Sequence, residues 1–355
     1  MIDWTKSMKQ TFEFYTVEPT TWHDQKRLTK VISANVTNDI DSDLLVSGSM
    51  ETDEIERETY IREYLVAEQD RATYRFPLAT LLVQTPDKTF NGTHTRSTSD
   101  GYSPLLELRD INVPLGYTFP KNIDILQTVY GNTRSYCRAP IVTVNFGETK
   151  QSVSDIVANT DDSWLSINQY LLDKAQYHYE LDELGKIYIA KNVNFSSLMY
   201  VYRFTMDNAS IVYPDLTISN DTYGIPNRLE VYLSSSAGVQ LTAVENTDPD
   251  SPVSIPTRGR VITRIDSEPN LQGPVTQQQL ELYAEEELKA LSTVTKSVSF
   301  SHGFNPIVKV GNAVMLDFPE VGLNRVIAKI TSQQIDLRPG CKVRRTAMFE
   351  ERLWK

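Results

Sequence analysis

The segment from Tyr223 to Asp266 reads YGIPNRLEVYLSSSAGVQLTAVENTDPDSPVSIPTRGRVITRID. Apolar and polar residues alternate in Ile225–Leu233, which is the period of a half-buried β-strand. Arg260–Asp266 repeats this alternation, and one face of this second strand is expected to carry Val261, Thr263 and Ile265. Between them, Glu245–Pro252 contains prolines and turn-forming Asn and Asp residues, so neither helix nor central strand is expected there. The pattern predicts a hairpin with a long polar loop, with the sheet of the C-terminal half wrapped around it.

The composition is that of a folded, acidic protein. The chain has 355 residues, of which 40% are hydrophobic, enough for packed cores in two or three domains. The 46 acidic residues outnumber the 35 basic ones, and no Lys/Arg cluster predicts sequence-specific nucleic-acid binding. No apolar run reaches the roughly 18 residues of a membrane helix, and no secretory signal opens the chain. We therefore expect folding in a cytoplasm, no stable membrane insertion, and two reduced, buried cysteines, Cys137 and Cys341.

The fold class predicted is mainly β with α+β insertions, in three regions. Residues 1–95 form a β-rich unit of short strands, residues 96–195 a mixed region of small helices and a hairpin, and residues 196–355 a second β-rich unit with one helix. Besides those of the opening segment, the predicted strands are Lys9–Val17, Arg27–Val36, Asp43–Ser49, Thr59–Gln69, Ala72–Gln84, Tyr177–Leu181, Lys186–Ala190, Val294–Ser301, Val308–Phe318, Arg325–Leu337 and Lys342–Phe349.

Helix signals occur at four places. Two of them are strong: Asp162 or Ser163 can cap a helix with apolar residues at helical spacing, and Thr276 with Gln279 forms a capping box. The other two are short helices, namely Ser103–Ile111, capped by Ser103, and Asp124–Tyr130, which is expected to end near Gly131-Asn132.

The motifs of common enzymes are missing from the sequence. The four histidines are not in a metal-binding spacing, and there is no nucleophile elbow, P-loop or dinucleotide fingerprint. We therefore predict no catalytic residues, no cofactor and no metal site.

Two acidic segments near the N-terminus are the first candidates for an interaction surface. Asp39, Asp41 and Asp43 begin like a calcium loop, but Leu44 stands where that loop needs Gly and Met50 where it needs Glu. Residues 51–58 form a charged run that is either a solvated surface or an acidic patch facing a partner or a channel. The predicted acidic lumen or partner patch consists of Asp39, Asp41, Asp43, Glu51, Asp53 and Glu54.

The polar loop of the opening segment is the second candidate. Its carboxylates could bind a cation, serve a structural connection between strands, or contact a neighbouring subunit. We predict a loop that contacts a neighbouring subunit or partner through Glu245, Asn246, Asp248 and Asp250.

Four segments in register over residues 100–355 resemble the hub proteins of bacteriophage tails. They are YSPLLELRDINVPLGYTFPKNIDILQTVYG, WLSINQYLLDKAQYHYELDELGKIYIAKN, the loop ENTDPDSPVSI with Arg258-Gly-Arg260, and LYAEEELKALSTVTKSVSFSHGFNPIVKVGNAVML. The family includes the baseplate hub of contractile phages and the N-terminal part of siphophage tail-associated proteins. The first 95 residues match it only in being β-rich.

The resemblance implies a fold of two tail-tube-like β-barrels joined by small helix and hairpin domains. It also implies a homotrimeric ring in the virion, at the tail tip or baseplate, that is assembled in the host cytoplasm and continues the tail tube. A distal tail or tube protein would lie above this ring, and a spike, fibre or tip protein below. Genomic DNA would pass through without specific binding, and an acidic lumen would repel its phosphates.

Two other classes stay open at the level of sequence. One is a wall-degrading tail-associated hydrolase, although 46 acidic residues give no specific pair of catalytic carboxylates. The other is a receptor- or glycan-binding β module, for which the 18 tyrosines are weak support because β-proteins use tyrosine widely.

Overall fold

The structure is a computed structural model that describes residues 2–90, 92, 95–142, 147–193, 199–207, 210–235, 238–271 and 275–354. It divides into two compact units, each described by itself below. Unit 1 comprises Met1–Asp215 and Phe300–Thr346, and unit 2 comprises Leu216–Ser299 and Ala347–Lys355. These units group the chain by compactness, and the predicted division into residues 1–95, 96–195 and 196–355 stays a prediction.

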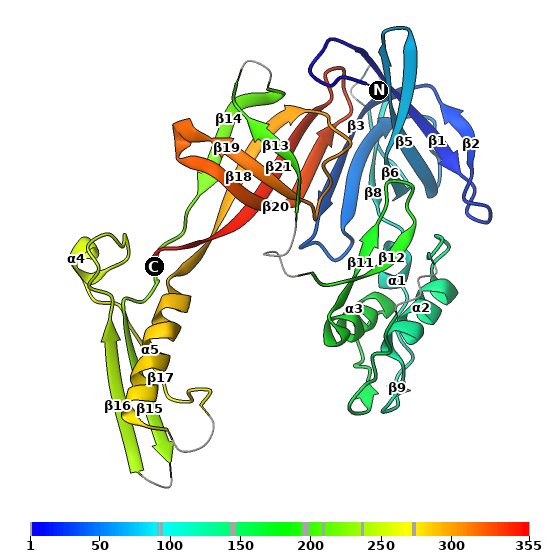
Figure 1. The fold of residues 1–355 in the computed structure, drawn as a ribbon. Coiled ribbons are helices and arrows are strands. Elements are labelled where there is room, and N and C mark those ends of the chain that lie inside the picture. Colours follow the sequence, from blue (N-terminus) through cyan, green and yellow to red (C-terminus); the bar gives the residue numbers. More distant parts are fainter. Residues whose placement is uncertain are drawn as a thin grey trace. The chain divides into compact units, whose positions relative to one another are not determined.

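Among the described residues, a 14-stranded sheet provides the framework of unit 1, and parts of β14, β18 and β21 fall within the residue ranges of unit 2 (Figure 1). Its main path is β14-β18-β21-β20-β3-β4-β8-β6-β5-β1-β2, with β13 and β19 attached at β20 and β7 at β8. The bounds are β1 Lys9–Val17, β2 Asp24–Leu28, β3 Val31–Asp39, β4 Val46–Thr52, β5 Thr59–Gln69, β6 Ala72–Val83, β7 Asp87–Phe90, β8 Thr95–Tyr102, β13 Tyr200–Thr205, β14 Val212–Ser219, β18 Thr293–Gly303, β19 Ala313–Phe318, β20 Leu323–Asp336 and β21 Lys342–Arg352. A short 3-10 helix, η2 (Pro319–Val321), lies between β19 and β20.

The N-terminal and C-terminal strands of unit 1 join at the antiparallel pair β3–β20, where Asn38 lies opposite Gln333. This pairing places residues almost 300 positions apart side by side. The mainly β fold that was predicted is therefore confirmed. The strand pairings of the described residues follow an open path, and the two closed barrels stay a prediction.

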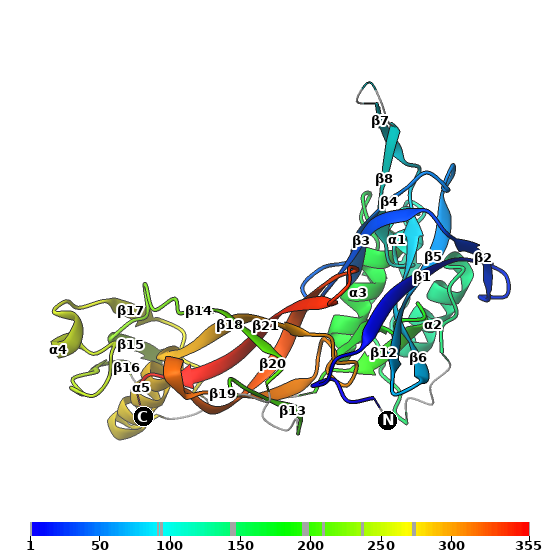
Figure 2. The same ribbon diagram turned by 90° about the horizontal axis from the view of Figure 1, so that it is seen from above.

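The middle region packs against this sheet as an α+β insertion (Figures 1 and 2). Its elements are α1 (Leu106–Arg109), β9 (Thr118–Phe119), α2 (Ile125–Tyr136), β10 (Ile156–Val157), α3 (Trp164–Ala175), β11 (Tyr177–Leu181) and β12 (Ile187–Lys191). The core of the insertion is continuous with side chains of the sheet, including Trp22, Tyr60 and Leu82. A second core of unit 1 lies among the strands and contains Ile61, Leu65 and Ile335.

Helix starts agree with the sequence where a side chain caps them. Ser163 accepts a hydrogen bond from Ser166 N at 3.1 Å and begins α3, as predicted. The predicted end of α2 was wrong, because the helix continues through Gly131 to Tyr136. A glycine weakens a helix by only about 1 kcal/mol, whereas α2 buries Val129 and Thr133.

Three other local predictions required correction. Ser103 does not cap α1, because its hydroxyl donates to Leu44 O at 2.5 Å and the helix begins at Leu106. The predicted strand Arg27–Val36 is broken at Thr29 and Lys30, whose N–H groups bond to Glu54 at 2.6 and 2.7 Å. The predicted strand Val308–Phe318 begins only at Ala313.

Unit 2 contains a three-stranded sheet and one long helix. The strands are β15 (Arg228–Ser235), β16 (Gly238–Glu245) and β17 (Thr263–Asp266), and the helices are α4 (Ile255–Arg258) and α5 (Gln277–Leu291). The capping box of Thr276 and Gln279 begins α5 as predicted. The core between α5 and the sheet contains Leu229, Val231, Leu280, Ala284 and Leu288.

The predicted hairpin with a long loop was wrong. β15 pairs antiparallel with β16, which follows it in the chain, whereas β17 lies on the other side of β15 and runs parallel to it. The polar segment after Glu245 is therefore a crossover connection between β16 and β17, because a parallel neighbour cannot be reached by a tight turn. In the predicted strand Arg260–Asp266, the face with Val261, Thr263 and Ile265 was expected to be half-buried. It is exposed, because Val261 is 50% and Ile265 is 67% accessible.

Candidate functional site

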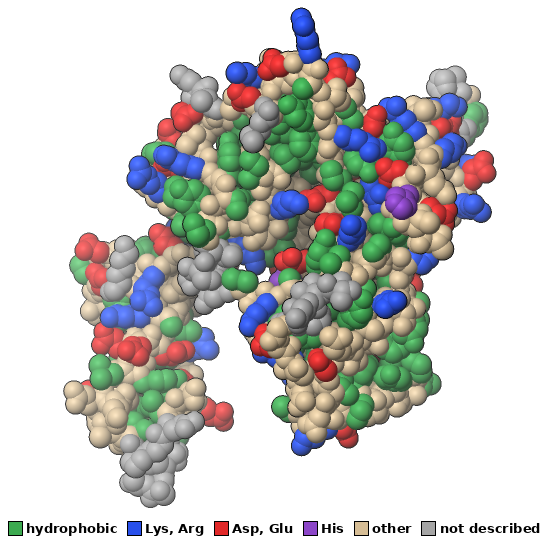
Figure 3. Space-filling model, turned by 45° about the vertical axis from the view of Figure 1, so that its right-hand side comes forward, with side chains coloured by type: hydrophobic (Ala, Val, Ile, Leu, Met, Phe, Trp, Pro, Cys, Tyr) green, Lys and Arg blue, Asp and Glu red, His purple; other side chains and the backbone are tan. Residues whose placement is uncertain are grey.

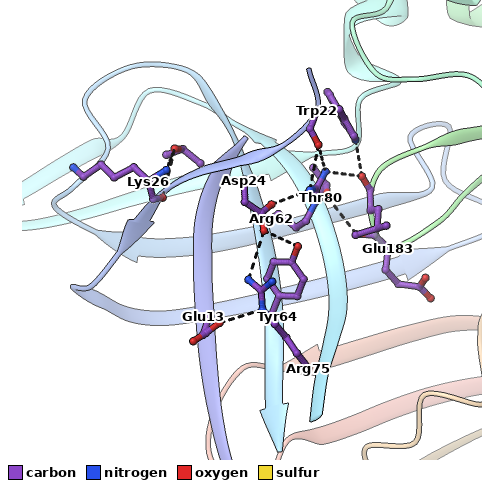
Figure 4. Close-up of polar contacts among 11 residues, drawn as sticks. Glu13, Trp22, Asp24, Lys26, Arg62, Tyr64, Arg75, Thr80 and Glu183 are labelled. Carbon is purple, nitrogen blue, oxygen red and sulfur yellow. Dashed lines mark hydrogen bonds and ion pairs between the residues drawn. The ribbon is translucent and has the colours of Figure 1, made fainter. Parts of the chain in front are cut away.

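The turn between β11 and β12 is fixed to the outer surface of the sheet (Figure 4). Trp22 Nε1 donates a hydrogen bond to Leu184 O at 2.7 Å, and Thr80 Oγ1 donates to Glu183 O at 3.2 Å. Gly185, at φ +74°, lies so close that an added Cβ would stand 2.8 Å from Thr80 Cβ. The insertion is thus held to the sheet by contacts that only glycine permits.

Arg62 is the centre of this junction. Its side chain is 5% exposed and pairs with Asp24 Oδ1 at 2.8 Å. Its guanidinium also donates to Thr80 Oγ1 at 2.9 Å and to Leu184 O at 3.1 Å. A buried charge needs such a complete set of partners, because each unpaired group would lose its hydration without compensation.

A ring of further groups completes the junction around Asp24. Tyr64 OH donates to Asp24 Oδ2 at 2.8 Å, and burial together with this carboxylate raises the pKa of Tyr64. Arg75 stacks over the Tyr64 ring at 3.4 Å and bonds to Glu13 at 3.1 Å. In Figure 4 the side chain of Glu183 points away from this network.

Glu183, which belongs to the β11–β12 turn, also lines a pocket of about 220 Å³. Four separate parts of unit 1 line it, namely β6, the paired strands β3 and β20, the turn β11–β12, and the segment between β18 and β19. Glu183 and Lys309 form an ion pair of 2.7 Å at its edge. The lining residues are Asn38, Phe76, Pro77, Leu78, Glu183, Phe304, Pro306, Val308, Lys309, Val310, Gln333 and Ile335.

A buried polar pair supports one wall of this pocket. Arg345, 1% exposed, donates from Nη2 to Val308 O and from Nε to His302 Nε2, both at 2.7 Å. Burial and the charge of Arg345 lower the pKa of His302 to about 3, so its imidazole is neutral and accepts this bond. Burial likewise lowers the pKa of Arg345 to about 9. Arg345 thus holds the backbone at Val308 from the interior, and His302 holds the guanidinium of Arg345 in place.

The pocket also holds two amide groups with unused acceptors. The side-chain oxygens of Asn38 and Gln333 are buried and receive no hydrogen bond from the described part of the chain. Gln333 is only 8% exposed, and the two residues are cross-strand partners. Apolar side chains surround them, including Leu78, Phe304 and Ile335.

The predicted contact loop, residues 245–252, is ordered by hydrogen bonds of buried asparagines. Asn246, predicted to face a partner, is fully buried and donates to Ser251 Oγ at 2.9 Å. Asn227, also buried, donates to Val253 O and Arg260 O, and it accepts from Ile262 N at 2.7 Å. These two asparagines fold the connection, so Asn246 is not available to a partner.

The carboxylates of the same loop remain on its surface. Glu245 accepts from Arg228 at 3.2 Å, and Asp248 Oδ1 accepts from Asp250 N at 2.9 Å. Asp250 is exposed and Asp248 is half-buried. Three of the four predicted contact residues can therefore reach a neighbour.

The predicted acidic patch is divided between the two ends of one hairpin. Asp39, Asp41 and Asp43 lie at the β3–β4 turn, whereas Glu51, Asp53 and Glu54 lie at the opposite end of β4. Glu51 is paired with Arg96 at 3.5 Å. Although burial acts to raise it, the pKa of Glu54 is lowered by hydrogen bonds from Lys30 N and Thr29 N. Figure 3 shows acidic and basic side chains interspersed over the displayed face.

The open face of the sheet in unit 2 exposes apolar side chains next to the ion pairs of Arg228 with Glu230 and Glu245. Val239, Leu241 and Ile265 are 58%, 65% and 67% exposed, and Tyr232 lies directly opposite Leu241 on the adjacent strand. The other face of this sheet is covered by α5. Contiguous exposed apolar side chains on one sheet face are typical of protein interaction surfaces.

Three other features concern the cysteines, metal-binding groups and membrane helices of the described residues. Both cysteines are free and buried, and burial raises the pKa of each thiol to about 12. Within the described ranges, no group of three or more His, Cys, Asp or Glu side chains is placed to hold a metal ion. No helix among these residues is long and apolar enough to cross a membrane. His94 lies outside the described residues.

Comparison with solved structures identifies the fold. The tail protein of Neisseria meningitidis MC58 matches with a TM-score of 0.61 and 11% identity, over 97% of this chain and 98% of that one. The 43 kDa tail protein of prophage MuSo2 from Shewanella oneidensis matches with a TM-score of 0.58 and 10% identity, over 95% and 98%. This is the fold of phage tail proteins. The resemblance to the tail hub family that the sequence indicated is therefore confirmed at the level of the fold.

A similar fold also occurs in a Francisella protein complex. The Francisella PdpA–VgrG complex matches with a TM-score of 0.57 and 9% identity, over 96% of this chain and 53% of that one. No family model and no curated protein sequence matches the chain. The likeness therefore lies in the three-dimensional arrangement, which is retained at a level of sequence identity where local motifs are lost.

Several residues of the site carried no sequence signal that we used. Arg62 lies in a strand whose other side chains are largely buried. A charged residue within the run TYIREYLVA was therefore the available sequence signal for a buried ion pair. Asn38, Gln333 and Arg345 are ordinary members of alternating strands. Only the pairing of β3 with β20 reveals that the first two meet at a pocket.

Proposed function

We propose that this chain is a structural component of a phage tail tip or baseplate. The observation that carries this proposal is a fold shared over nearly the whole length of two tail proteins, with TM-scores of 0.61 and 0.58. Three copies would form a hub ring that continues the tail tube, joins a distal tail or tube protein above, and anchors a spike, fibre or tip protein below. The proposed role is mechanical, with no reaction catalysed.

Two surface features of unit 2 support a role in assembly. The open face of the β15–β16–β17 sheet exposes apolar side chains that a neighbour would remove from water. The loop carboxylates Asp248 and Asp250 are held by an ordered connection rather than by a mobile one. We infer that this loop contacts an adjacent subunit or another tail protein.

Charge reversal in the loop tests that contact. Asp248→Lys with Asp250→Lys is expected to reduce the yield of complete tails while leaving thermal unfolding of the purified chain unchanged, because both carboxylates lie outside the packed core. Glu281→Lys with Glu286→Lys, on the exposed side of α5, is the matched control. Normal tails from the loop variant would contradict the contact.

Passage of DNA through the ring is the second part of the proposal. The two acidic ends of the β3–β4 hairpin would line the channel at two levels, where they would repel phosphates. Mapping these residues in an assembled tail tests this idea. A neutral or basic channel wall would refute the acidic lumen and leave the structural role in place.

The primary test is the location of the chain in the virion. Tails purified from cells that produce the complete particle are expected to contain the chain at a threefold ring, visible in averaged electron-microscope images. Deleting its gene is expected to stop tail completion. Complete and infectious tails without the chain would refute the proposed function.

A further inference from the structure

Strand β16 is an edge of the three-stranded sheet in unit 2. The order of this sheet is β16-β15-β17, so within the described residues β16 pairs with a strand on one side only. Asn246 N donates to Asn227 O at 2.8 Å, which makes these two residues a hydrogen-bonded pair of the antiparallel ladder. Because bonded and non-bonded pairs alternate, the odd-numbered residues of 239–245 have N–H and C=O groups that point away from β15. In agreement, Arg228 N points away from β16 and donates to Ile262 O at 3.2 Å.

This edge has none of the features that usually prevent another strand from pairing with an edge. Such features are lysine, proline or a bulge on the edge strand. The strands at the two ends of the main sheet have them, because β2 contains Lys26 and Arg27 and β14 contains Pro214. By contrast, β16 reads GVQLTAVE and pairs with β15 without a register shift. Its exposed apolar side chains, those of Val239 and Leu241, belong to the residues whose backbone groups point outwards.

The position of α5 argues against a second copy of β16 as the occupant of this edge. Gln277, the first residue of α5, donates from Nε2 to the outward carbonyl of Leu241 at 3.1 Å, so the helix lies over the edge. Antiparallel pairing of two β16 strands would place both α5 helices on the same face of the joined sheet. Paired strands lie roughly 4.8 Å apart, whereas packed helices need about 8–10 Å. A strand without a covering helix avoids this overlap.

The charges beyond the end of β16 indicate the charge of the incoming strand. Glu245, the last residue of β16, is paired with Arg228. Asp248 and Asp250 follow in the loop, and neither has an ion pair within the described ranges. A basic residue next to this end would provide the complementary charge.

We propose that β16 takes an added β-strand from a neighbouring protein of the tail, with apolar residues at every second position and a Lys or Arg just before the strand. The added strand runs antiparallel to β16, which is the slightly more stable pairing, so its first residues adjoin the end with Asp248 and Asp250. Its alternate apolar side chains extend the open face beside Val239 and Leu241. Backbone hydrogen bonds supply affinity, and the side chains supply specificity. This inference rests on the proposed tail function, which supplies the neighbouring protein.

Binding of a model strand to the purified full chain is the first arm of the test. The probe is the blocked and fluorescently labelled peptide Lys-Lys-Thr-Val-Thr-Val-Thr-Val. Two control peptides carry proline in place of the central threonine, or glutamate in place of both lysines. The wild type is expected to bind the probe saturably and about tenfold more tightly than either control, as measured by fluorescence anisotropy. No saturable binding, or equal binding of the probe and either control, would overturn the proposal.

Variants at Ala243 locate the binding at the edge. This residue is exposed, and its N–H points away from β15, so Ala243→Pro removes an outward donor and leaves the β15–β16 ladder intact. The substitution is expected to weaken probe binding about tenfold, whereas Ala243→Ser, which keeps the N–H, is the matched control. Equal binding by the two variants would refute the edge as the site. If the wild type self-associates in sedimentation without peptide and Ala243→Pro abolishes this, the occupant is a second copy and the proposal is overturned.

Tail assembly is the last arm. Ala243→Pro is expected to lower the yield of complete tails about tenfold relative to Ala243→Ser. Thermal unfolding of both purified variants checks that each folds; if Ala243→Pro does not, Leu241→Lys, which places a charge on the same edge, takes its place. Normal assembly of a folded edge variant would refute the added strand. In that case the chain is still found in tails, so the proposed function survives separately.

Discussion

The junction of unit 1 buries its charges, whereas the sheet of unit 2 leaves apolar side chains in water. Arg62 is 5% exposed and bonds to Asp24, to the hydroxyl of Thr80 and to the carbonyls of Trp22 and Leu184, of which the last belongs to the insertion. In unit 2, Leu241 and Ile265 cover nothing. The first region is a packed interior, and the second is a surface that α5 does not cover.

Substitutions in the junction of unit 1 and on the open face of unit 2 are expected to have different effects. Removing a group from the junction leaves partners buried and unpaired, so it lowers the stability of the chain itself. Removing an apolar group from the open face of unit 2 leaves no cavity, so its effect is expected on assembly. The predictions below separate these two outcomes.

The largest effect is expected at Arg62. Arg62→Ala leaves Asp24 and the carbonyl of Leu184 without their buried donor, and the free energy of unfolding is expected to fall by about 3–5 kcal/mol. Arg27→Ala is the control, since this side chain is 54% exposed and its partner Glu13 keeps its ion pair with Arg75; its loss is expected to stay below about 1 kcal/mol. Urea denaturation measures both, and equal losses would break the contrast between buried and exposed pairs.

A pH-dependent effect of several kcal/mol is expected at Glu63. This carboxyl is 1% exposed, its Oε2 has no partner among the described residues, and burial raises its pKa to about 8 from 4.5. The folded chain therefore holds a proton that the unfolded chain releases above pH 4.5. The stability of the wild type relative to Glu63→Gln is full below pH 4.5 and is lost as the pH rises to about 8, by on the order of 5 kcal/mol.

Urea denaturation of wild type and Glu63→Gln at pH 5, 6.5, 8 and 9 measures this difference. The two curves are expected to separate up to pH 8 and then to run parallel. A constant difference across this range would mean that Glu63 is ionised in the folded chain and would contradict its burial as a neutral acid.

A smaller effect is expected at the glycine of the β11–β12 turn. Gly185→Ala and Gly116→Ala share the same backbone strain, with φ +74° and +72°, but only the former meets Thr80 and Trp22. Gly185→Ala is therefore expected to lower the free energy of unfolding by about 1–2 kcal/mol more than Gly116→Ala. Similar losses in thermal or urea unfolding would show that the turn is not packed tightly on the sheet.

The smallest effect on stability is expected on the open face of unit 2. Leu241→Ser is expected to change the free energy of unfolding by less than about 0.5 kcal/mol, because its side chain is 65% exposed. Leu280→Ala, beneath α5, is expected to lower it by about 2–4 kcal/mol. If both substitutions were equally harmful to unfolding stability, the open face would be part of a core and not an assembly surface.

Local signals in the sequence predicted the elements that depend on neighbouring residues. Ser163 and the pair Thr276–Gln279 marked two helix starts correctly, because a cap needs only three or four consecutive residues. The alternation in Lys9–Val17 likewise predicted β1. Errors arose where distant packing decides the outcome, as in α2, whose buried face carries the helix past Gly131.

Strand pairing and the site were beyond the reach of local patterns. The strand after the polar loop was placed correctly, but its parallel pairing with β15 depends on the sheet edge that remains free once β16 has formed. Asn246 looked like a surface residue because asparagine is common in turns, and its burial depends on Asn227 and Ser251. The pocket amides meet only through β3–β20.

The most direct test of the account is an averaged electron-microscope map of the complete tail, with the chain located by a tag fused to the C-terminus. The account predicts three copies in a ring at the tail tip or baseplate, coaxial with the tube, with the open sheet face of unit 2 covered by a neighbouring chain. Complete tails in which the chain is missing, or in which it lies as isolated copies off the tail axis, would contradict it.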